Sequence, residues 1–520
     1  MIKNTKNTVE IFSITLKILF LIFIAPSAIA QNNSSSPYSR FGIGDMQSSG
    51  FTETDGMGTS SIALHEPFNI NFSNPASYSS IKLTTFEFGA TSNFTKFSSA
   101  GFPSNTTNTS NISYVALAFP VIANRWGASF GMMPFSNVGY KISDADTIGG
   151  TTENYLYTGS GGFNQLYFGN AVNICKSLSV GANISYLFGS IERQNTVEFP
   201  SLTSAQNTRI TNTIHINDLT YKVGLFFTLD SIKVDSSKIY GPKHKLNVLQ
   251  CTDEALVVAN SKDTLWIRNK LIQLKRFEVM SNTSAGITFA NERDTLYVNN
   301  TLGKLKIDTA LDNIKEVKIK SDRSFSVGLT YSLNSSLHAT TDSLSERYLS
   351  TSLGGVAIHD TINYTSGIKG RITLPMSLGF GIAYKKGQRL LLSAEASIQD
   401  WTKYTFYGQS DQLANSMKIA AGAQISPDLI QAKTFFKSIT YRFGAYYSKT
   451  YLDLKSTQLD DIGITLGCSL PVFRSLSKIN ISMQAGQRGT LMNNLIREQY
   501  IRLGLGFSLS DRWFIKYKYE

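Results

Sequence analysis

The stretch GANISYLFGSI, residues 181–191, decides the fold class because its apolar side chains recur at every second position. Ile184, Tyr186 and Phe188 fall on one face of an extended chain, and Ser185 falls on the other. A period of two is the period of a β-strand, in which successive side chains point to opposite faces. This stretch therefore predicts a strand with one apolar face.

The same pattern returns along most of the chain after residue 83. One face carries aromatic and aliphatic side chains, and the other carries Gly, Ser, Ala or charged residues. The connections between these segments are rich in Asn, Ser, Thr and Gly and are unequal in length. The repeats include YKVGLFFTL (221–229), FSVGLTYSL (325–333), RLLLSAEASIQDW (389–401), YRFGAYYSKTYLDL (441–454), ITLGCSL (464–470) and YIRLGLGFSLS (500–510).

Two all-β architectures compete for this pattern. A soluble sandwich buries the apolar face against a second sheet and uses short strands. A transmembrane barrel turns that face to lipid, with strands of about 9–11 residues or more that end in aromatic girdles. Many of the stretches run past ten residues, which favours a closed transmembrane antiparallel β-barrel. The side chains expected in the interfacial aromatic girdle are Trp401, Tyr404, Tyr446, Tyr447 and Trp513.

The N-terminus, residues 1–30, predicts a signal peptide. Lys3 and Lys6 form a basic region, ILFLIFIAPS (18–27) is a short apolar core, and the sequence ending at Ala30 is an A-x-A cleavage site. A membrane anchor is the alternative, but the apolar run is short for a span. No other stretch reaches 18 consecutive apolar residues. The pattern therefore predicts an exported chain of the Gram-negative cell outer membrane.

Composition narrows the partners of the 520-residue chain. Its formal net charge is +12, which suits anionic lipid head groups or nucleic acid. The basic residues are scattered and the chain is predicted to be exported, so we expect outer-membrane lipid and no nucleic acid as a partner. Cys175, Cys251 and Cys468 are too few and too far apart for a disulfide framework.

Several segments, taken in order, resemble the long-chain fatty acid transporter (FadL-type) family of outer-membrane barrels. GMGTSSIALHEPFNINFSNPAS (56–77) is similar to that family's hatch, and LPMSLGFGIAYKKGQRLLLSAEASIQDWTKY (374–404) to its Leu-Pro strand, turn and Trp-bearing strand. YKVGLFFTLD, RSFSVGLTYSL and YRFGAYY resemble further strands of the family. SPYSRFGIGD (36–45) and RWFIKYKYE (512–520) resemble outer-membrane proteins of Bacteroidetes-type bacteria.

The resemblance implies a barrel of about 14 strands with an N-terminal hatch folded into its lumen. Residues 31–81 would form this hatch or plug, residues 82–229 the first part of the barrel, and residues 323–510 the second part. The residues expected to gate the lumen are Phe72, Asn74, Pro75 and Ala76.

The Asn-Pro step at the end of this hatch predicts a rigid corner. Pro75 fixes its own φ and lacks a backbone donor, and it favours an extended backbone at Asn74. The Asn74 side chain can then cap the turn that follows, directing Ile81 toward the first strand. A plain Asn-Pro turn before any strand is the alternative.

Two segments lie outside the family pattern. Residues 230–322 are more charged than the barrel and contain an echo, DTLWIRNKL (263–271) against DTLYVNNTL (294–302). The echo favours a small inserted β-rich module with a duplicated hairpin, although chance similarity is the alternative. The resemblance places this insertion in the periplasm, where a surface loop is the alternative. Residues 511–520 are expected to form a C-terminal extension.

Catalytic patterns are absent from the sequence. None of the five histidines belongs to a motif with metal-ligand spacing. His338 with Asp342 and His359 with Asp360 are pairs that a polar loop produces by chance. We therefore expect no enzyme, no cofactor and no metal.

Two functions remain. The first, which the resemblance implies, is an outer-membrane channel that takes up small hydrophobic molecules through a hatch-gated barrel, with exit sideways through the wall. The alternative is a non-transporting barrel that acts as a scaffold or plug in an envelope or protein-secretion complex, with a periplasmic or secretion-system protein bound through 230–322. The lumen should discriminate between them, because a hydrophobic path needs a connected apolar lining, whereas a scaffold lumen can be packed shut.

Overall fold

The chain divides into two compact units. Residues Met1–Leu229 with Asp322–Glu520 form the first, and Asp230–Ser321 form the second. The predicted signal peptide, residues 512–520 and Trp513 lie outside the described residues. The computed structural model describes residues 36–47, 50–148, 151–175, 177–200, 205–233, 319–350, 356–387, 389–411, 413–426, 438–472 and 475–511, with four short strands inside 234–318.

The first unit is a closed antiparallel barrel of 14 strands, which confirms the predicted fold class. The last strand pairs with the first wall strand from Thr84↔Asp511 to Ser99↔Ile496, and this ladder closes the ring. Three of the wall strands consist of two pieces each: β12 with β13, β14 with β15, and β16 with β17. No helix in the described part of the chain is long and apolar enough to span a membrane.

The wall strands are β2 (Thr84–Ser99), β3 (Phe102–Ile122), β4 (Trp126–Ile148), β5 (Thr151–Cys175), β6 (Leu178–Glu198), β7 (Asn207–Lys233), β12 (Ile319–Ser332), β13 (Ser335–Ser350), β14 (Val356–Leu374), β15 (Ser377–Lys386), β16 (Leu390–Gln399), β17 (Thr405–Phe406), β18 (Ser416–Ile425), β19 (Thr440–Leu454), β20 (Thr457–Pro471), β21 (Lys478–Arg488) and β22 (Ile496–Asp511).

The alternation seen in the sequence is the alternation of the wall. In β6, Ile184 and Tyr186 are 46% and 41% exposed, whereas Ser185 between them and Leu187 after them are buried toward the lumen. The same outward apolar pattern is found on the other wall strands, for example at Ile464 in β20. The outer face of the barrel is therefore an apolar belt of the kind that faces lipid.

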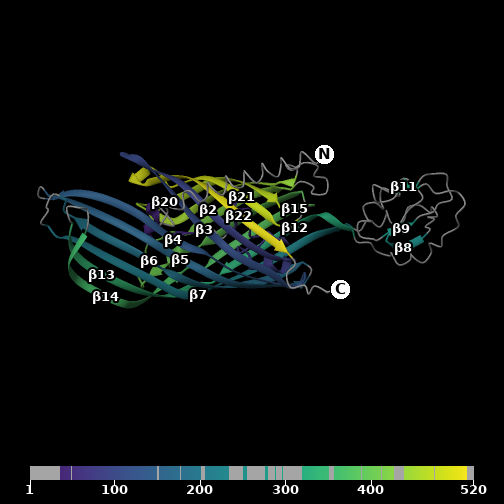
Figure 1. Ribbon diagram of the computed structural model, residues 1–520, viewed down its shortest axis with the longest axis horizontal. Coiled ribbons are helices and arrows are strands. Elements are labelled where there is room, and N and C mark those ends of the chain that lie inside the picture. The colour runs from purple at the N-terminus through teal and green to yellow at the C-terminus, as the bar shows by residue number, and fades with distance from the viewer. Residues whose placement is uncertain are drawn as a thin grey trace. The chain divides into compact units, whose positions relative to one another are not determined.

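The wall is uneven in height. The strands β4, β5 and β7 contain 23, 25 and 27 residues, but β18 and β21 contain 10 and 11. Figure 1 shows the hairpins β4–β5 and β13–β14 reaching well past β20–β22 at one end of the barrel. We call this end of the barrel the tall end.

A seam opens in the wall between β3 and β4. Their ladder runs only from Ile122↔Trp126 to Val115↔Met132. Beyond Val115 and Met132, toward the tall end, β3 is paired only with β2 among the wall strands, and β4 is paired with β5. The short strand β1 (Asp45–Met46) from the N-terminal segment pairs with β4 at this level.

The N-terminal segment lies inside the barrel as two parts, which together we call the plug. We call residues 36–47 the strap; it contains the 3₁₀ turn η2 (Pro37–Arg40) and β1. We call residues 51–81 the hatch; it contains the short helix α2 (Thr52–Asp55) and the 3₁₀ helix η3 (Pro75–Ser80). Two further 3₁₀ turns, η6 (Trp401–Lys403) and η8 (Met492–Asn494), lie in the wall connections.

The predicted corner at the end of the hatch is confirmed. Asn74 is extended, with φ −126° and ψ 105°, and its side-chain oxygen accepts a hydrogen bond from the backbone N–H of Ala76 at 3.1 Å. Pro75 is the first residue of η3, where a missing N–H costs nothing. The chain then leaves η3 at Ile81 and enters β2.

The second unit is described only by two strand pairs. β8 (Gln250–Glu254) pairs with β9 (Arg276–Glu278), and β10 (Ile287–Thr288) pairs with β11 (Thr295–Leu296). β11 belongs to the second copy of the sequence echo, whereas the first copy, 263–271, lies outside the described residues.

The predicted interfacial girdle is wrong for three of its members. Trp401, Tyr404 and Tyr446 are 2%, 1% and 7% exposed and point into the barrel. The chain turns inward at η6 after the end of β16, so period-two counting fails there, and Trp401 stacks on Tyr451 at 4.4 Å instead of facing lipid. Tyr447 is half-buried, and its hydroxyl donates to a carboxylate on the neighbouring strand at 3.1 Å.

Candidate functional site

The hatch sits directly on glycines of the lumen wall. A Cβ on Gly444 would lie 2.1 Å from the backbone nitrogen of Gly58, and a Cβ on Gly127 would lie 1.9 Å from the carbonyl oxygen of Tyr78. Glycine in a strand marks the close approach of another backbone, and such glycines occur on both sides of the barrel. Other wall glycines in contact with the hatch include Gly181, Gly224, Gly328, Gly422 and Gly467.

A buried ion pair ties the hatch to the wall strand β19. The Arg442 guanidinium, 1% exposed, binds the Glu53 carboxylate of α2. Its Nε donates to Gln424 Oε1 at 2.7 Å and its Nη1 donates to Ser469 Oγ at 2.5 Å. Removing either ion would leave the other charge buried without a partner, so this pair fixes the position of α2. We call it the floor clamp.

A second wall carboxylate holds the backbone of the hatch. Glu395 in β16 accepts hydrogen bonds from the N–H groups of Ser61 and Ile62 at 2.7 and 3.1 Å. Lys418 in β18 lies 3.3 Å from the other carboxylate oxygen of Glu395 and also donates to the Thr59 hydroxyl. The hatch is therefore held by charged groups as well as by its shape.

The strap has an ionic clamp of its own. Arg488 in β21 donates to Asp45 of β1 at 2.9 Å and to Glu498 of β22 at 2.7 Å. Its Nη2 also donates to Ser36 Oγ at 2.5 Å. Tyr38 donates through its hydroxyl to the Ile496 carbonyl at 2.5 Å. We call the set around Arg488 the strap clamp.

An apolar cluster fills the lumen at the level of the strap, where the tall wall strands contribute many of its side chains. Tyr38 and Ile43 of the strap pack with Trp401 and Tyr404 of the wall connection after β16 and with Tyr451 of β19. We call this cluster the cap. Its further wall residues include Val138, Phe163, Leu187, Ile191, Ile214, Ile216, Leu337, Ile372, Leu374, Leu452 and Leu459.

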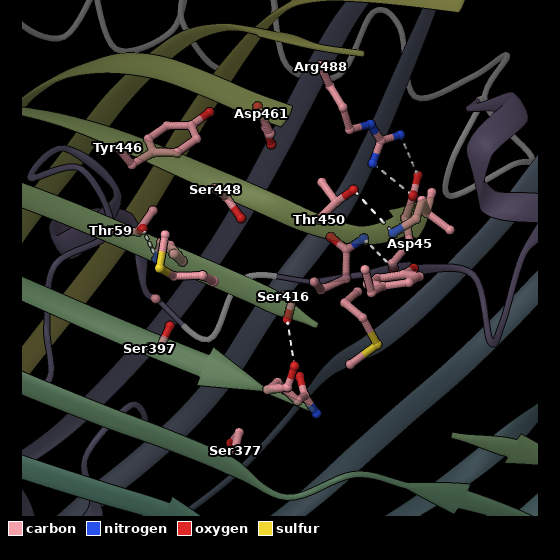
Figure 2. A pocket seen from close by; sticks show the side chains of 18 of the residues that line it. Asp45, Thr59, Ser377, Ser397, Ser416, Tyr446, Ser448, Thr450, Asp461 and Arg488 are labelled. Atoms are coloured by element: carbon pink, nitrogen blue, oxygen red, sulfur yellow. Dashed lines mark hydrogen bonds and ion pairs between the residues drawn. The ribbon is translucent and has the colours of Figure 1, made fainter. Parts of the chain in front are cut away.

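A cavity of about 450 Å³ extends from the strap to the hatch. We call it the chamber. Figure 2 shows Arg488 reaching Asp45 across it, with Tyr446 and Asp461 on the neighbouring strands. Charged side chains line it from several strands, so its lining is not the connected apolar path expected of a hydrophobic channel. They are Asp45, Lys222, Glu395, Lys418, Asp461, Arg488, Glu498 and Arg502.

The four predicted gating residues all lie in the hatch and are buried. Asn74 donates from Nδ2 to the carbonyls of Ile62 at 2.8 Å and Leu225 at 3.1 Å, so it joins two parts of the hatch to β7. Phe72 packs against the ring of a β5 tyrosine at 4.6 Å. Pro75 and Ala76 face Gly181 of β6. Their contacts are those of an anchor, and gating by them stays a prediction.

The surroundings of the hatch shift the pKa values of three of its side chains. Burial raises the pKa of Asp55 to about 7, against the opposing effect of Arg502 and Lys418. It lowers the pKa of His65 to about 4. Burial alone would raise the pKa of Glu66, but the Lys385 ammonium 2.8 Å away brings it below the ordinary value.

The strap, the two clamps and the cap were not identified from the sequence. One signal for the floor clamp was present, because Arg442 alternates with the lipid-facing Tyr441 and Phe443 and must therefore point into the lumen. A buried guanidinium requires an acidic partner. That the partner is Glu53, 389 positions away, follows only from the fold.

Solved structures share this architecture at low sequence identity. The Pseudomonas putida toluene transporter TodX is 13% identical, with 91% of this chain and 100% of that chain covered and a TM-score of 0.50. The Ralstonia pickettii toluene transporter TbuX is 12% identical, with 89% and 99% covered and a TM-score of 0.47. A Pseudomonas aeruginosa FadL homologue is 10% identical, with 90% and 98% covered and a TM-score of 0.45. At such identities the likeness concerns the fold alone.

Sequence comparison identifies the family more directly. No curated protein matches the sequence. The sequence profile described as BamG matches residues 11–299 and 295–520, which together span nearly the whole chain. The chain therefore belongs to the BamG family.

Proposed function

We propose that this protein is a plugged outer-membrane barrel that serves as a fixed scaffold in an envelope assembly and does not pass solutes through its lumen. The apolar belt supports the membrane placement, since such a face is stable only against lipid. The contact of the hatch backbone with wall glycines on both sides of the barrel is the observation that carries the proposal. A plug in such close contact cannot move without separating many contacts at once.

The electrostatics of the lumen support the same conclusion. A hydrophobic molecule in the chamber would contact the charged side chains of Lys222, Glu395 and Lys418. It would also contact the charged side chains of the strap clamp. Displacing water from charged groups without replacing their hydrogen bonds is unfavourable. The lumen therefore suits a permanent plug better than the passage of apolar molecules.

The second unit gives the scaffold a place for partners. The chain leaves the wall after β7 and returns at β12, both at the barrel end where β2 begins and β22 ends. This end is opposite to the tall one. We propose that the tall end faces the cell surface, because long hairpins of such barrels are extracellular, and that the end with the insertion faces the periplasm. We propose that residues 230–322 contact a periplasmic or secretion-system protein, which a solute channel would not require.

A disulfide between the strap and the wall tests the proposal. Met46 and Ser136 are directly paired across β1 and β4, and paired residues of an antiparallel ladder lie within the Cα range of a disulfide. The variant Met46→Cys/Ser136→Cys is made after replacing Cys175, Cys251 and Cys468 with serine. Complementation of a deletion strain is measured beside each single-cysteine control.

A scaffold keeps its function when the strap is locked, and loses it when residues 230–321 are replaced by a short turn. Loss of complementation in the locked protein, restored by a membrane-permeant reductant, would contradict the scaffold proposal. The single-cysteine controls exclude an effect of either substitution alone.

A second candidate function is a lateral route for hydrophobic molecules. The seam between β3 and β4 favours it, because the wall lacks a ladder there among the described strands. The fold is also shared with TodX, which is a toluene transporter. In this case a molecule would enter at the tall end and leave sideways above Met132, at the upper edge of the apolar belt.

Uptake into proteoliposomes tests this second function. An apolar fluorescent dye is offered to vesicles containing the wild-type protein or the Met46→Cys/Ser136→Cys variant, before and after reduction. A lateral route predicts faster uptake than in empty vesicles, with loss on oxidation. Uptake equal to that of empty vesicles in both redox states would exclude the route for that dye.

A further inference from the structure

The outer wall carries a basic group above the apolar belt. In the β13–β14 ladder, His338 is opposite Arg371 and Thr340 is opposite Lys369. His338 and Thr340 are two positions apart on β13 and so share one face, which places Arg371 and Lys369 on that face as well. His338, Lys369 and Arg371 are all exposed. We call these three side chains the basic face.

Only part of the charge of the basic face is satisfied within the protein. His338 Nδ1 lies 2.7 Å from Asp218 Oδ2. Among the described side chains, Lys369 and Arg371 have no ion-pair partner. Two cations that lie two positions apart on one strand therefore face outward without an ion-pair partner among the described side chains, which favours an anionic ligand with more than one oxygen.

An apolar hollow of about 350 Å³ lies lower on the same part of the wall. Met376 and Leu378 line it from β15 and its approach, Ile398 from β16 and Met417 from β18. The hydroxyl of Tyr331, on the belt face of β12, lies 3.7 Å from the Met376 sulfur, so the hollow opens on the lipid-facing side. Its one carboxylate, Asp400, is paired with Lys403 at 3.1 Å.

The two features lie on one chain segment in the order that an amphipathic lipid requires. Arg371 precedes Met376 by five residues, which is at most about 16 Å along a strand. The basic face belongs to the tall end and the hollow to the upper belt. A phosphate on the first and an acyl chain in the second would match the head and tail of a lipid in the outer leaflet.

We propose that this wall segment binds a phosphorylated glycolipid of the outer leaflet, with its phosphate on Lys369 and Arg371 and an acyl chain in the hollow beside Met417. The proposal rests on the outer-membrane placement given above and is independent of the scaffold role. A phosphate-free or zwitterionic lipid would leave the two cations without their counter-charge, so the site selects an anionic headgroup.

Calorimetric titration of the purified full-length protein with bicelles tests the proposal. Phosphatidylcholine bicelles with and without lipid A are compared with inorganic phosphate. The variant Lys369→Gln/Arg371→Gln is expected to bind lipid A about tenfold more weakly or worse, because each cation adds to the attraction of an anionic lipid surface. The matched control, Lys96→Gln/Lys141→Gln, removes two exposed lysines elsewhere and should bind as the wild type does.

A second variant tests the acyl-chain site separately from the phosphate site. Met417→Gln keeps the size of the side chain and should weaken the binding of lipid A while leaving the binding of its deacylated phosphosugar unchanged. Equal lipid A binding by wild type and Lys369→Gln/Arg371→Gln would overturn the proposal. So would equal binding of phosphatidylcholine bicelles, or inorganic phosphate binding as tight as lipid A. Because these titrations use the isolated protein, failure of the scaffold proposal does not affect their outcome.

Discussion

The two faces of the barrel wall obey different rules although the same strands form them. In β19 and β20 the outward side chains Phe443 and Ile464 are simply apolar. The inward ones are individually matched: Arg442 binds Glu53, and the Thr465 hydroxyl accepts from the Gly58 N–H at 2.7 Å. Lipid selects for a class of side chain, whereas the plug selects for particular residues.

The difference teaches where substitutions should be tolerated. On the lipid face one apolar residue can replace another, because no specific contact is lost. On the lumen face a change affects a partner that is hundreds of positions away. Four substitutions test this comparison, in decreasing order of the expected effect.

The largest effect is expected at the floor clamp. Arg442→Met leaves Glu53 buried without a counter-charge and should cost about 3–5 kcal/mol of plugged-state stability. Limited proteolysis of the hatch in detergent, followed over urea concentration, measures it.

The double variant Arg442→Met/Glu53→Gln is the informative control. It removes both charges, so it should recover much of the loss. If the single and double variants release the hatch at the same urea concentration, the clamp contributes through shape and not through charge.

The next effect belongs to the lipid face. Ile464→Lys places a charge at the centre of the outward stretch of β20, and about 2–4 kcal/mol is expected for a lysine near the bilayer midplane. Refolding into vesicles, followed by heat-modifiable migration on gels, reports the change. Ile464→Val should refold as the wild type does, and a normal yield of Ile464→Lys would place this residue away from the hydrocarbon.

A smaller effect is expected where the hatch touches the wall. Gly444→Ala brings a methyl group to 2.1 Å from the Gly58 nitrogen, and overpacking of this kind costs about 1–3 kcal/mol. The neighbouring Ala445→Val points outward and is the matched control. Proteolysis of the hatch should accelerate only in Gly444→Ala, whereas equal rates would mean that the hatch backbone can move aside.

The smallest effect is a pH dependence. Burial raises the pKa of Asp55 to about 7, so the plugged state holds a proton that the released hatch loses near pH 4. Plug stability contributed by Asp55 should therefore be complete below pH 4, fall between pH 4 and about 7, and change little above that. Asp55→Asn should flatten this slope in the same proteolysis assay, and an unchanged slope would assign it to another group.

The same contrast explains how far the sequence could be interpreted. Lipid imposes a periodic pattern, and the strands around Ile184 and Phe443 were predicted from that pattern. The corner at Asn74 and Pro75 was predicted because it depends on local backbone chemistry. Function at the lumen face was harder, because the partners of Arg442 and Arg488 come from distant parts of the chain.

The mistaken girdle residues show the limit of counting by period. Trp401 and Tyr404 follow β16 and looked like the aromatic end of a membrane strand. The chain instead turns inward at η6, and both side chains join the cap. An aromatic residue suits both a lipid interface and an apolar core, so its identity alone cannot distinguish the two.

The clamps also impose an order of events on assembly. The strap and hatch emerge first during synthesis, yet Ser36 meets Glu498 462 positions later and Glu53 meets Arg442 389 positions later. Neither clamp can form until β19, β21 and β22 are in place, and β22 is also the strand that closes the ring on β2. Ring closure and the final anchoring of the strap and hatch therefore depend on the same C-terminal strands.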